Sequence, residues 1–214
     1  MLIDQLPGLA SRILYEDAEL LVIDKPAGLA VHPGPKTPHS LEDHLDDLRL
    51  GFRQRPQPVH RLDRDTSGCL LLARNRRALK RLGALFEQGA VTKTYVALLA
   101  GRHEGDGRID APLSKISSRE KGWRMRVDPA GKSAATLWRV LEPRGDHTLV
   151  EFRPLTGRTH QIRVHAAHAL SPLVGDPVYG QADPAMSMRL HALGLSFPWK
   201  HGTIAVEAPL PWNG

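Results

Sequence analysis

Short apolar runs, separated by Gly, Pro and Asp, recur along most of this 214-residue chain. Runs of this kind, bounded by turn residues, are typical of β-strands. Helix patterns are few, and they do not alternate with the strands as they do in parallel βαβ folds. The order therefore predicts an α+β fold on a mostly antiparallel or mixed sheet. The expected strands cover residues 12–15, 20–23, 30–32, 69–73, 93–99, 123–127, 134–141, 148–153, 190–197 and 203–206.

Three segments repeat their apolar residues at the helix period instead. Each follows a Ser, Asn or Thr, residues that commonly cap helix N-termini, and two are followed closely by Gly or Pro, which end helices. The expected helices are 41–48 after Ser40, 76–88 between Asn75 and Gly89, and 160–170 between Thr159 and Pro172.

The net charge is positive, because 29 Lys and Arg face 23 Asp and Glu, giving +6 at neutral pH. A basic excess concentrates polyanions near the surface, and nucleic acid is the commonest of them. Many soluble proteins are mildly basic, so charge alone does not assign a partner. One face of the second expected helix is either simply solvated or contacts RNA. That face carries Arg76, Arg77, Lys80 and Arg81.

Several features bear on where the protein works. The single cysteine, Cys69, lies in an apolar run, which predicts a buried filler, no disulfide within the chain and a reducing compartment. The N-terminus has an early Asp4 and lacks the pattern of a signal peptide. No stretch approaches the roughly 18 apolar residues of a membrane helix. We expect a soluble, cytoplasmic monomer without membrane contact.

Residues 60–68, HRLDRDTSG, gather three cationic or imidazole groups, two carboxylates and two hydroxyls in nine positions. Asp63 lies between Arg61 and Arg64, whose charges favour the ionised carboxylate that a nucleophile or base requires. The Asp-Thr-Ser-Gly that follows has the composition of a turn. From these residues alone the segment is an anion-binding or catalytic loop.

A second cluster, GRTHQIRVH, covers residues 157–165. His160 and Arg163 are three residues apart, so a helix would place them on one face. Arg158 would lie just before that helix, whose N-terminus attracts phosphate. The alternative is an amphipathic helix whose polar side is basic.

The eleven histidines do not form a metal-binding pattern. His160, His165 and His168 are spaced five and three apart, and zinc sites on helices use an i, i+4 pair or cysteine pairs. We therefore expect no metal site.

At these two clusters the sequence resembles the RluA family of pseudouridine synthases. HRLDRDTSG fits the signature of that family at each defining position, and it and four further blocks occur along the chain in the family's order. These blocks are ILYEDAELLVIDKPAGLAVHPG, KTYVALLAG, GRTHQIRVHAAHAL with GDPVYG, and RLHALGLSF. The resemblance implies the pseudouridine synthase fold, an extended mixed sheet in two subdomains with a basic catalytic cleft between them.

The resemblance also implies roles for individual residues. Asp63 matches the catalytic aspartate, and Arg163 matches the arginine that pairs with it. Tyr95 matches the aromatic residue that lies against the target base and takes part in proton removal. Arg61 matches a position that enters the RNA as the uridine leaves its stack. The residues expected to contact RNA are Arg61, His60, Arg64, Thr66, Arg158 and His160.

The implied reaction detaches uridine from C1′ and rejoins it through C5. Three routes are open to Asp63: attack on C1′, addition to C6, or removal of a ribose proton to make a glycal. A stacked uridine cannot react in this way, so the nucleotide must be flipped into a pocket. The reaction involves neither redox chemistry nor group transfer to another molecule, so we expect no cofactor.

Two departures from the family pattern affect the interpretation. Only a dozen residues precede ILYED, so we expect residues 1–214 to be a single catalytic domain without the N-terminal S4 RNA-binding domain of many relatives. This organisation resembles the short members that act on tRNA, on large-subunit rRNA, or on both. The segment FPWKHG differs from the usual His-Pro after the last strand, which affects only the expected turn.

Two other functional classes remain as alternatives. The first is a non-catalytic RNA-binding or chaperone protein on the same fold, which loss of Asp63, Tyr95 or Arg163 would have favoured. The second is a metal-dependent nucleic-acid hydrolase, which the missing metal-ligand spacing argues against.

Overall fold

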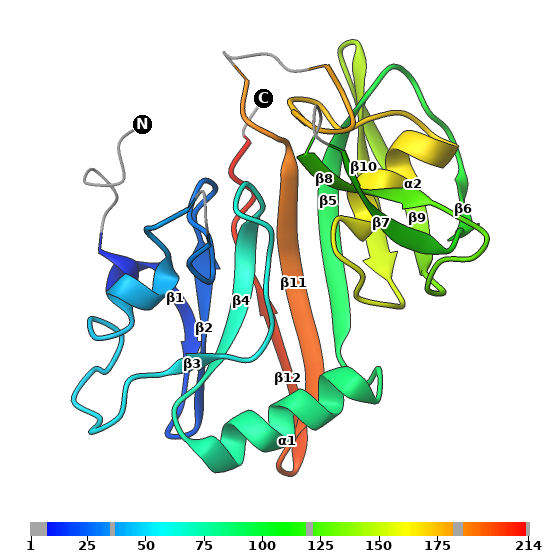
Figure 1. Ribbon diagram of the computed structural model, residues 1–214. Helices are drawn as coiled ribbons and strands as arrows, with labels where there is room; N and C mark the ends of the chain where they lie inside the picture. Colours follow the sequence, from blue (N-terminus) through cyan, green and yellow to red (C-terminus); the bar gives the residue numbers. More distant parts are fainter. Residues whose placement is uncertain (1–7, 35–36, 119–121, 182–185, 213–214) are drawn as a thin grey trace. The chain divides into compact units, whose positions relative to one another are not determined.

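The computed structural model (Figure 1) describes residues 8–34, 37–118, 122–181 and 186–212. The chain forms two compact units. The first contains Met1–Lys93 and Ala192–Pro211, and the second contains Thr94–His191 and Trp212–Gly214. Strands β5 (Thr92–Ala100) and β11 (Leu190–Trp199) run from one unit into the other.

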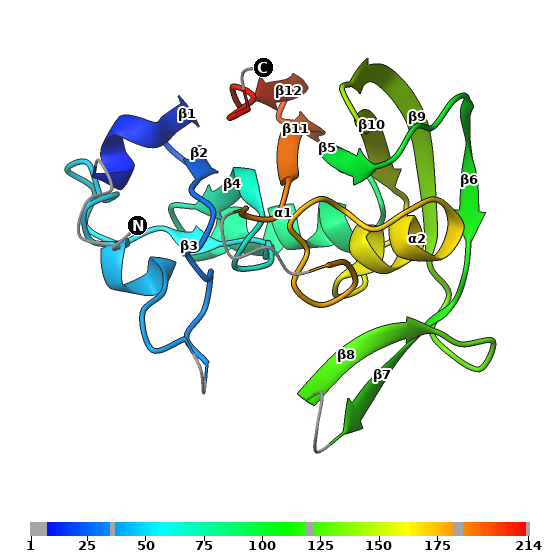
Figure 2. The same ribbon diagram turned by 90° about the horizontal axis from the view of Figure 1, so that it is seen from above.

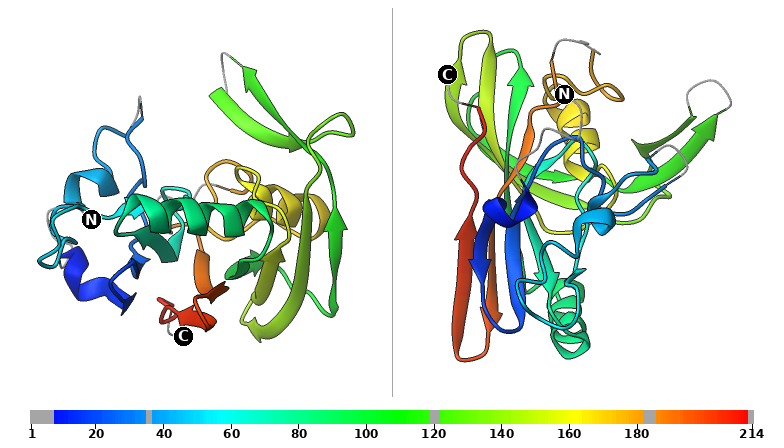
Figure 3. Two further views of the ribbon diagram at one scale, coloured as in Figure 1. Left: turned by 90° about the horizontal axis from the view of Figure 1, so that it is seen from below. Right: turned by 90° about the vertical axis from the view of Figure 1, so that its left-hand side faces the viewer.

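The sheet of the first unit has the strand order β1-β2-β4-β11, with β12 added beside β11 and the short β3 beside β4 (Figure 1). The pairs β1–β2, β2–β4, β3–β4 and β11–β12 are antiparallel. Figure 3 (right) shows β11 and β12 as a hairpin. The elements are η2 (Leu9–Arg12), β1 (Ile13–Glu16), β2 (Leu20–Lys25), η3 (Leu41–His44), β3 (Gln57–Pro58), β4 (Ser67–Ala73), α1 (Arg76–Glu87) and β12 (Gly202–Glu207).

Both faces of the central strands in the first unit are buried. One face of β4 carries Cys69 and Leu71 and packs with Ala78 and Leu82 of α1. The residues between them, such as Leu70, are also fully buried. Burial on both faces explains why this strand reads as a continuous apolar run and not as an alternating one. Cys69 is fully buried, which confirms the buried filler expected from the sequence, and burial raises the pKa of its thiol to about 12.

Helix α1 covers one face of this sheet and begins as the sequence predicts (Figure 3, left). The Asn75 side chain accepts a hydrogen bond from the Ala78 N–H at 2.8 Å, which satisfies one of the free donors of the first turn. The helix ends at Glu87, and Gly89 follows with a φ of +71°. Both bounds therefore agree with the capping signals.

The second unit has the strand order β5-β10-β9-β6 and a separate hairpin, β7–β8. Its core joins β5 and β10 to helix α2 through residues such as Ala97, Phe152 and Ile162. Figure 2 shows α2 between this sheet and the hairpin, where Val164 packs near Met125. The elements are β6 (Asp106–Asp110), β7 (Leu113–Ser118), β8 (Gly122–Val127), β9 (Ala135–Arg144), β10 (His147–Pro154) and α2 (Gln161–Ala169).

The few helices and the antiparallel pairing confirm the α+β class, but several local expectations are wrong. Residues 30–32 make only one bridge, between Ala30 and Ser40, and not a strand. The expected helix 41–48 is a single 3-10 turn, η3, because Asp46 and Asp47 would place negative charge at the negative end of a longer helix. Strands β6 and β7 were missed because their sequences are mostly polar.

The C-terminal turn also differs from expectation. Strand β11 continues through Pro198 to Trp199, and the chain turns at Lys200, whose φ is +52°.

A helix that spans a membrane must be both long and apolar. No helix of the described residues combines the necessary length with the necessary hydrophobicity.

The first unit also contains a close backbone approach that tests this packing. Gly68 has a φ of +104°, and a Cβ at this position would lie 2.7 Å from the carbonyl carbon of Ala192 and clash with its oxygen. We expect Gly68→Ala to lower the free energy of unfolding by at least about 2 kcal/mol, because both the clash and the backbone conformation are unfavourable. Urea unfolding measures this loss.

Gly83→Ala is the matched control. This glycine lies inside α1, and a Cβ would meet nothing within 4 Å. The substitution should raise stability by about 0.5–1 kcal/mol, because alanine favours the helix. Equal effects of the two substitutions would contradict the packing described here.

Candidate active site

The loop before β4 presents Asp63 at its surface. Asp63 is half-buried, its neighbour Leu62 is buried, and Arg61 is exposed. The Asp63 carbonyl accepts a hydrogen bond from the Thr66 N–H at 3.1 Å, which closes the turn. The Gly28 N–H donates to the Arg64 carbonyl at 2.9 Å. The backbone on both sides of Asp63 is therefore fixed.

A buried lysine, Lys25, is hydrogen-bonded to the same loop. The Lys25 side chain is fully buried, and its ammonium group donates to the carbonyls of Pro26 at 2.8 Å, Leu29 at 2.7 Å and Arg64 at 3.1 Å. Three acceptors match the three protons of an ammonium group. Burial lowers the pKa of Lys25 to about 7, although the carboxylates of Asp65, Asp63 and Asp24 oppose this shift. Lys25 therefore joins the segment after β2 to the loop that carries Asp63.

His60 is the first residue of the signature, and its partners lie within the first unit. Its Nε2 accepts a hydrogen bond from the Leu71 N–H at 3.1 Å, and its ring stacks on Phe86 of α1 with centroids 4.7 Å apart. Burial, with the nearby charge of Lys93, lowers the pKa of His60 to about 4 against a hydrogen bond to the Arg61 backbone. His60 is therefore a neutral residue that positions the loop, and its expected contact with RNA stays a prediction.

The two arginines of the signature differ in their surroundings. Arg64 donates hydrogen bonds to both carboxylate oxygens of Asp65, at 2.9 and 3.2 Å. The expectation that the flanking arginines keep Asp63 ionised stays a prediction. Arg61 has no ion pair among the described residues. Thr66 is buried, and its hydroxyl has no hydrogen-bond partner among the described residues.

Arg163, in the second unit, is held by a carboxylate that the sequence analysis did not single out. Its Nε and Nη2 donate to the two oxygens of Asp176, both at 2.8 Å, and both side chains are buried. Burial raises the pKa of Asp176, but the hydrogen bonds and charge of Arg163 and the N–H groups of Val178 and Tyr179 outweigh burial and lower it. Because Asp63 belongs to the other unit, its pairing with Arg163 stays a prediction.

Helix α2 begins differently from the sequence prediction. Its N-cap is His160 and not Thr159, and His160 has a φ of +53°. His160 therefore lies outside the helix and does not share a helical face with Arg163. Its Nδ1 lies 2.9 Å from the Tyr179 hydroxyl, which also accepts a hydrogen bond from the Met125 N–H at 2.9 Å.

Gln161 fixes the turn that carries Arg158. The Arg158 N–H donates to the Gln161 amide oxygen at 3.0 Å, and the Gln161 amide nitrogen donates to the Ala135 carbonyl at 2.9 Å. The Arg158 side chain is exposed and donates to the Ser133 carbonyl at 3.0 Å. The expected contacts of Arg158 and His160 with RNA remain predictions.

Tyr95 lies in β5, one residue after the point where the second unit begins. It pairs with Phe152 of β10 across the ladder and is half-buried against the core of the second unit. Its expected place against the target base stays a prediction.

Three residues of this arrangement were missed by sequence reasoning: Lys25, Asp176 and Tyr179. All three lie inside blocks that match the family, IDKPAG and GDPVYG, but each also contacts a residue at least 13 positions away in sequence. Membership of a matched block was the only signal that could have found them.

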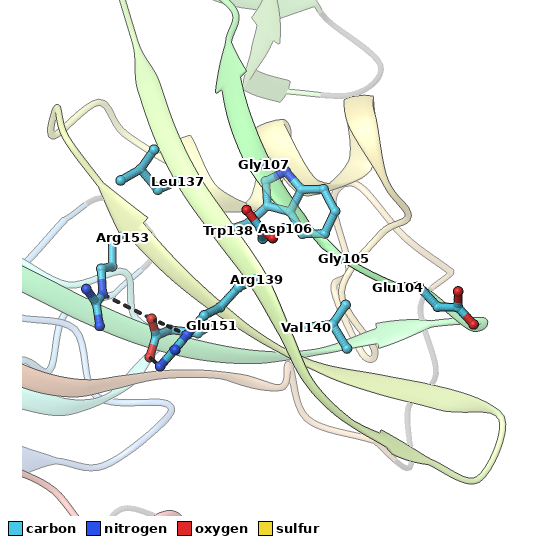
Figure 4. A pocket seen from close by; sticks show the side chains of 10 residues that line it. All are labelled: Glu104, Gly105, Asp106, Gly107, Leu137, Trp138, Arg139, Val140, Glu151 and Arg153. Carbon is cyan, nitrogen blue, oxygen red and sulfur yellow. Dashed lines mark hydrogen bonds and ion pairs between the residues drawn. The ribbon is translucent and has the colours of Figure 1, made fainter.

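A cavity of about 630 Å³ lies on β6, β9 and β10 of the second unit (Figure 4) and contains none of the predicted site residues. Glu151 on its wall is paired with Arg139 at 3.0 Å and with Arg153 at 3.0 Å. No group of three or more metal-ligating side chains occurs among the described residues.

The unusual environment of Lys25 leads to a pH prediction. Between pH 7 and 10.5 an unfolded chain keeps the proton that folded Lys25 has released, so folding is favoured as pH rises in this range. The penalty for burying the ammonium form is full below about pH 7 and disappears as pH rises to 10.5. We expect the unfolding free energy of the native protein, relative to Lys25→Met, to rise by about 1.4 kcal/mol for each unit by which pH is raised within this window. Urea unfolding at several pH values measures it, and a pH-independent difference would contradict it.

Comparison with known proteins agrees with the blocks found in the sequence. The family model for RNA pseudouridylate synthase matches residues 19–168. A protein of Zymomonas mobilis described as an uncharacterized RNA pseudouridine synthase is 52% identical over 211 residues, which cover 96% of each chain. Ribosomal large subunit pseudouridine synthase D of Nitrosomonas europaea is 40% identical, over 97% of this chain and 64% of that protein. This chain thus spans less than two thirds of the Nitrosomonas relative.

Solved structures agree on the fold. The human protein RNA pseudouridylate synthase domain containing 1 has a TM-score of 0.79 and 31% identity, over 93% of this chain and 83% of that one. The human protein RNA pseudouridylate synthase domain containing 4 has a TM-score of 0.78 and 26% identity, over 95% and 90%. These matches confirm the pseudouridine synthase fold expected from the sequence. The chain belongs to the RNA pseudouridylate synthase family.

Proposed function

We propose that the chain isomerises specific uridines of structured RNA to pseudouridine, with Asp63 as the catalytic carboxylate. The observation that carries this proposal is the signature loop, which is pinned on both sides of Asp63 while the Asp63 side chain stays partly exposed. A carboxylate held in this way needs little reorganisation to meet a reacting atom. The loop lies inside the region matched by the family model.

The reaction breaks the bond from N1 to C1′ and forms one from C5 to C1′. The hydrogen on C5 leaves as a proton, and N1 gains one, so the product is an isomer of the substrate. The three routes considered above all need Asp63 in its ionised form, because attack on carbon and proton removal both use a carboxylate lone pair. The expected activity therefore depends on a positive partner for Asp63.

Arg163 is proposed as that partner, and Tyr95 as the platform for the flipped base. The buried bidentate pair with Asp176 supports a role for Arg163 as a positioned cation, because it fixes the guanidinium plane. The half-buried ring of Tyr95 supports stacking. The exposed Arg61 is proposed to enter the RNA beside the extruded nucleotide.

The substrate class we propose is tRNA, large-subunit (23S) rRNA, or both. The net charge of +6 supports an RNA partner. The name of the relative from Nitrosomonas europaea supports large-subunit rRNA. The flipped-nucleotide requirement supports loops and bulges of folded RNA, where unstacking costs least.

The first prediction concerns Asp63. Asp63→Asn keeps the shape of the side chain but removes the carboxylate, so pseudouridine formation should fall at least about 1,000-fold while RNA affinity changes little. The measurement is pseudouridine mapping in RNA from cells that lack the protein and are supplied with each variant. Asp46→Asn is the matched control, since Asp46 is an exposed carboxylate paired with Arg49. Normal modification by Asp63→Asn would remove Asp63 from its role.

A second prediction separates two roles of Arg163. Arg163→Met and Asp176→Asn both break the buried pair, so both should lower thermal stability. Only Arg163→Met removes the proposed positive partner of Asp63. Its single-turnover rate should therefore fall most at low pH and recover partly as pH rises. If the pH profiles of the two variants run parallel to the native profile, Arg163 acts only through Asp176.

A further inference from the structure

Helix α1 exposes a surface that the proposed chemistry does not use. Its buried side carries Ala78 and Leu82, and its opposite side carries four exposed cations. We call this surface the α1 basic face, formed by Arg76, Arg77, Lys80 and Arg81.

The electrostatic arrangement within α1 is unfavourable for the helix itself. Arg76 and Arg77 begin the helix, where the macrodipole favours negative charge, and no acidic residue lies in the first turn. Arg76 with Lys80, and Arg77 with Arg81, are like-charge pairs four residues apart, and such pairs destabilise helices. The four cations therefore do not stabilise the helix by their charge.

Nearby carboxylates do not neutralise the α1 basic face. None of its four cations makes an ion pair with a described residue, whereas some exposed cations elsewhere do. Arg108 pairs with Asp110, and Lys200 with Glu19. Within the part of the chain that the structure describes, the guanidinium of Arg81 also lies 4.4 Å from the centroid of the Trp199 ring, a contact that brings no negative charge.

The α1 basic face is separated from Asp63 by the length of a strand. The signature loop ends where β4 begins at Ser67, and α1 begins just after β4 ends at Ala73. Seven residues of strand span roughly 20 Å. An RNA bound at Asp63 would reach the first turn of α1 only with nucleotides well away from the target uridine.

We propose that the α1 basic face is a second RNA-binding surface, which holds the phosphate backbone of a helical arm remote from the target uridine. Arginine suits this role, because its planar fork binds phosphate oxygens in pairs. The choice of RNA as the occupant rests on the proposed function. The observation that no described carboxylate pairs with the four cations does not depend on the proposed function.

The test measures how RNA affinity depends on salt. The probe is a 20-base-pair RNA duplex of arbitrary sequence, and the variant is Arg76→Gln/Arg77→Gln/Lys80→Gln, which keeps Arg81 on Trp199. Each phosphate contact contributes about 0.9 to the slope of log affinity against log salt, so the variant should lose up to about 2.7 of that slope. Its affinity at moderate salt should fall by about ten-fold or more.

The matched control is Arg49→Gln/Arg108→Gln/Lys200→Gln, which lowers the net charge by the same amount. Each of these cations already has a carboxylate partner. The control should keep the native slope. If both triple variants lose the same slope, only net charge matters and the proposal fails.

A stability measurement guards against misfolding. Because the α1 charges oppose one another, the α1 variant should have a melting temperature equal to or above that of the native protein. Lower affinity together with a lower melting temperature would assign these cations a structural role and overturn the proposal. An unchanged RNA slope with lost binding to phosphatidylserine vesicles would overturn it in favour of a membrane surface.

The outcome is separable from that of the proposed function. Duplex binding needs no turnover, so a reduced slope would support the surface even if no pseudouridine were formed. An unchanged slope with active isomerisation would overturn only the α1 basic face.

Discussion

The hydrogen bonds of the buried Lys25 amino group hold the backbone of the signature loop. The amino group binds the carbonyls of Pro26, Leu29 and Arg64, and so joins two segments that are 39 residues apart in sequence. A lysine buried in this way is costly unless its protons are all used. Here the three hydrogen bonds offset part of the cost. They also fix the loop backbone, while Asp63 stays partly exposed to solvent. Positioning of this kind is what a carboxylate needs if it is to act on a flipped nucleotide without rearrangement.

In the second unit, a buried ion pair positions the charged side chain of Arg163. Arg163 needs Asp176, because an arginine buried alone would be strongly unfavourable. Asp176 in turn accepts hydrogen bonds from the N–H groups of Val178 and Tyr179, which fixes the GDPVYG turn. The Tyr179 hydroxyl continues the network to His160 and to the β7–β8 hairpin. The matched blocks are thus tied together by hydrogen bonds between residues distant in sequence.

The sequence predicted those features that depend on local chemistry. Asn75 and Gly89 bound α1 as their capping preferences require, and the apolar run after the signature loop is a buried strand. Features set by distant partners were not predicted. His160 takes the N-cap position of α2, with its ring nitrogen beside the Tyr179 hydroxyl, although Thr159 is the better cap by local preference. Likewise, Lys25 reads as an ordinary strand-end lysine until its three carbonyl partners are known.

Release of the C5 hydrogen tests the central claim most directly, because bond formation at C5 must displace it. The experiment incubates the purified protein with tRNA and 23S rRNA transcripts that carry tritium at C5 of uridine. No cofactor or free nucleotide is added. The account predicts that tritium appears in water in step with pseudouridine in the RNA, and that the Asp63→Asn variant releases none. Release of tritium by that variant, or no release by the native protein from any transcript of either class, would contradict it.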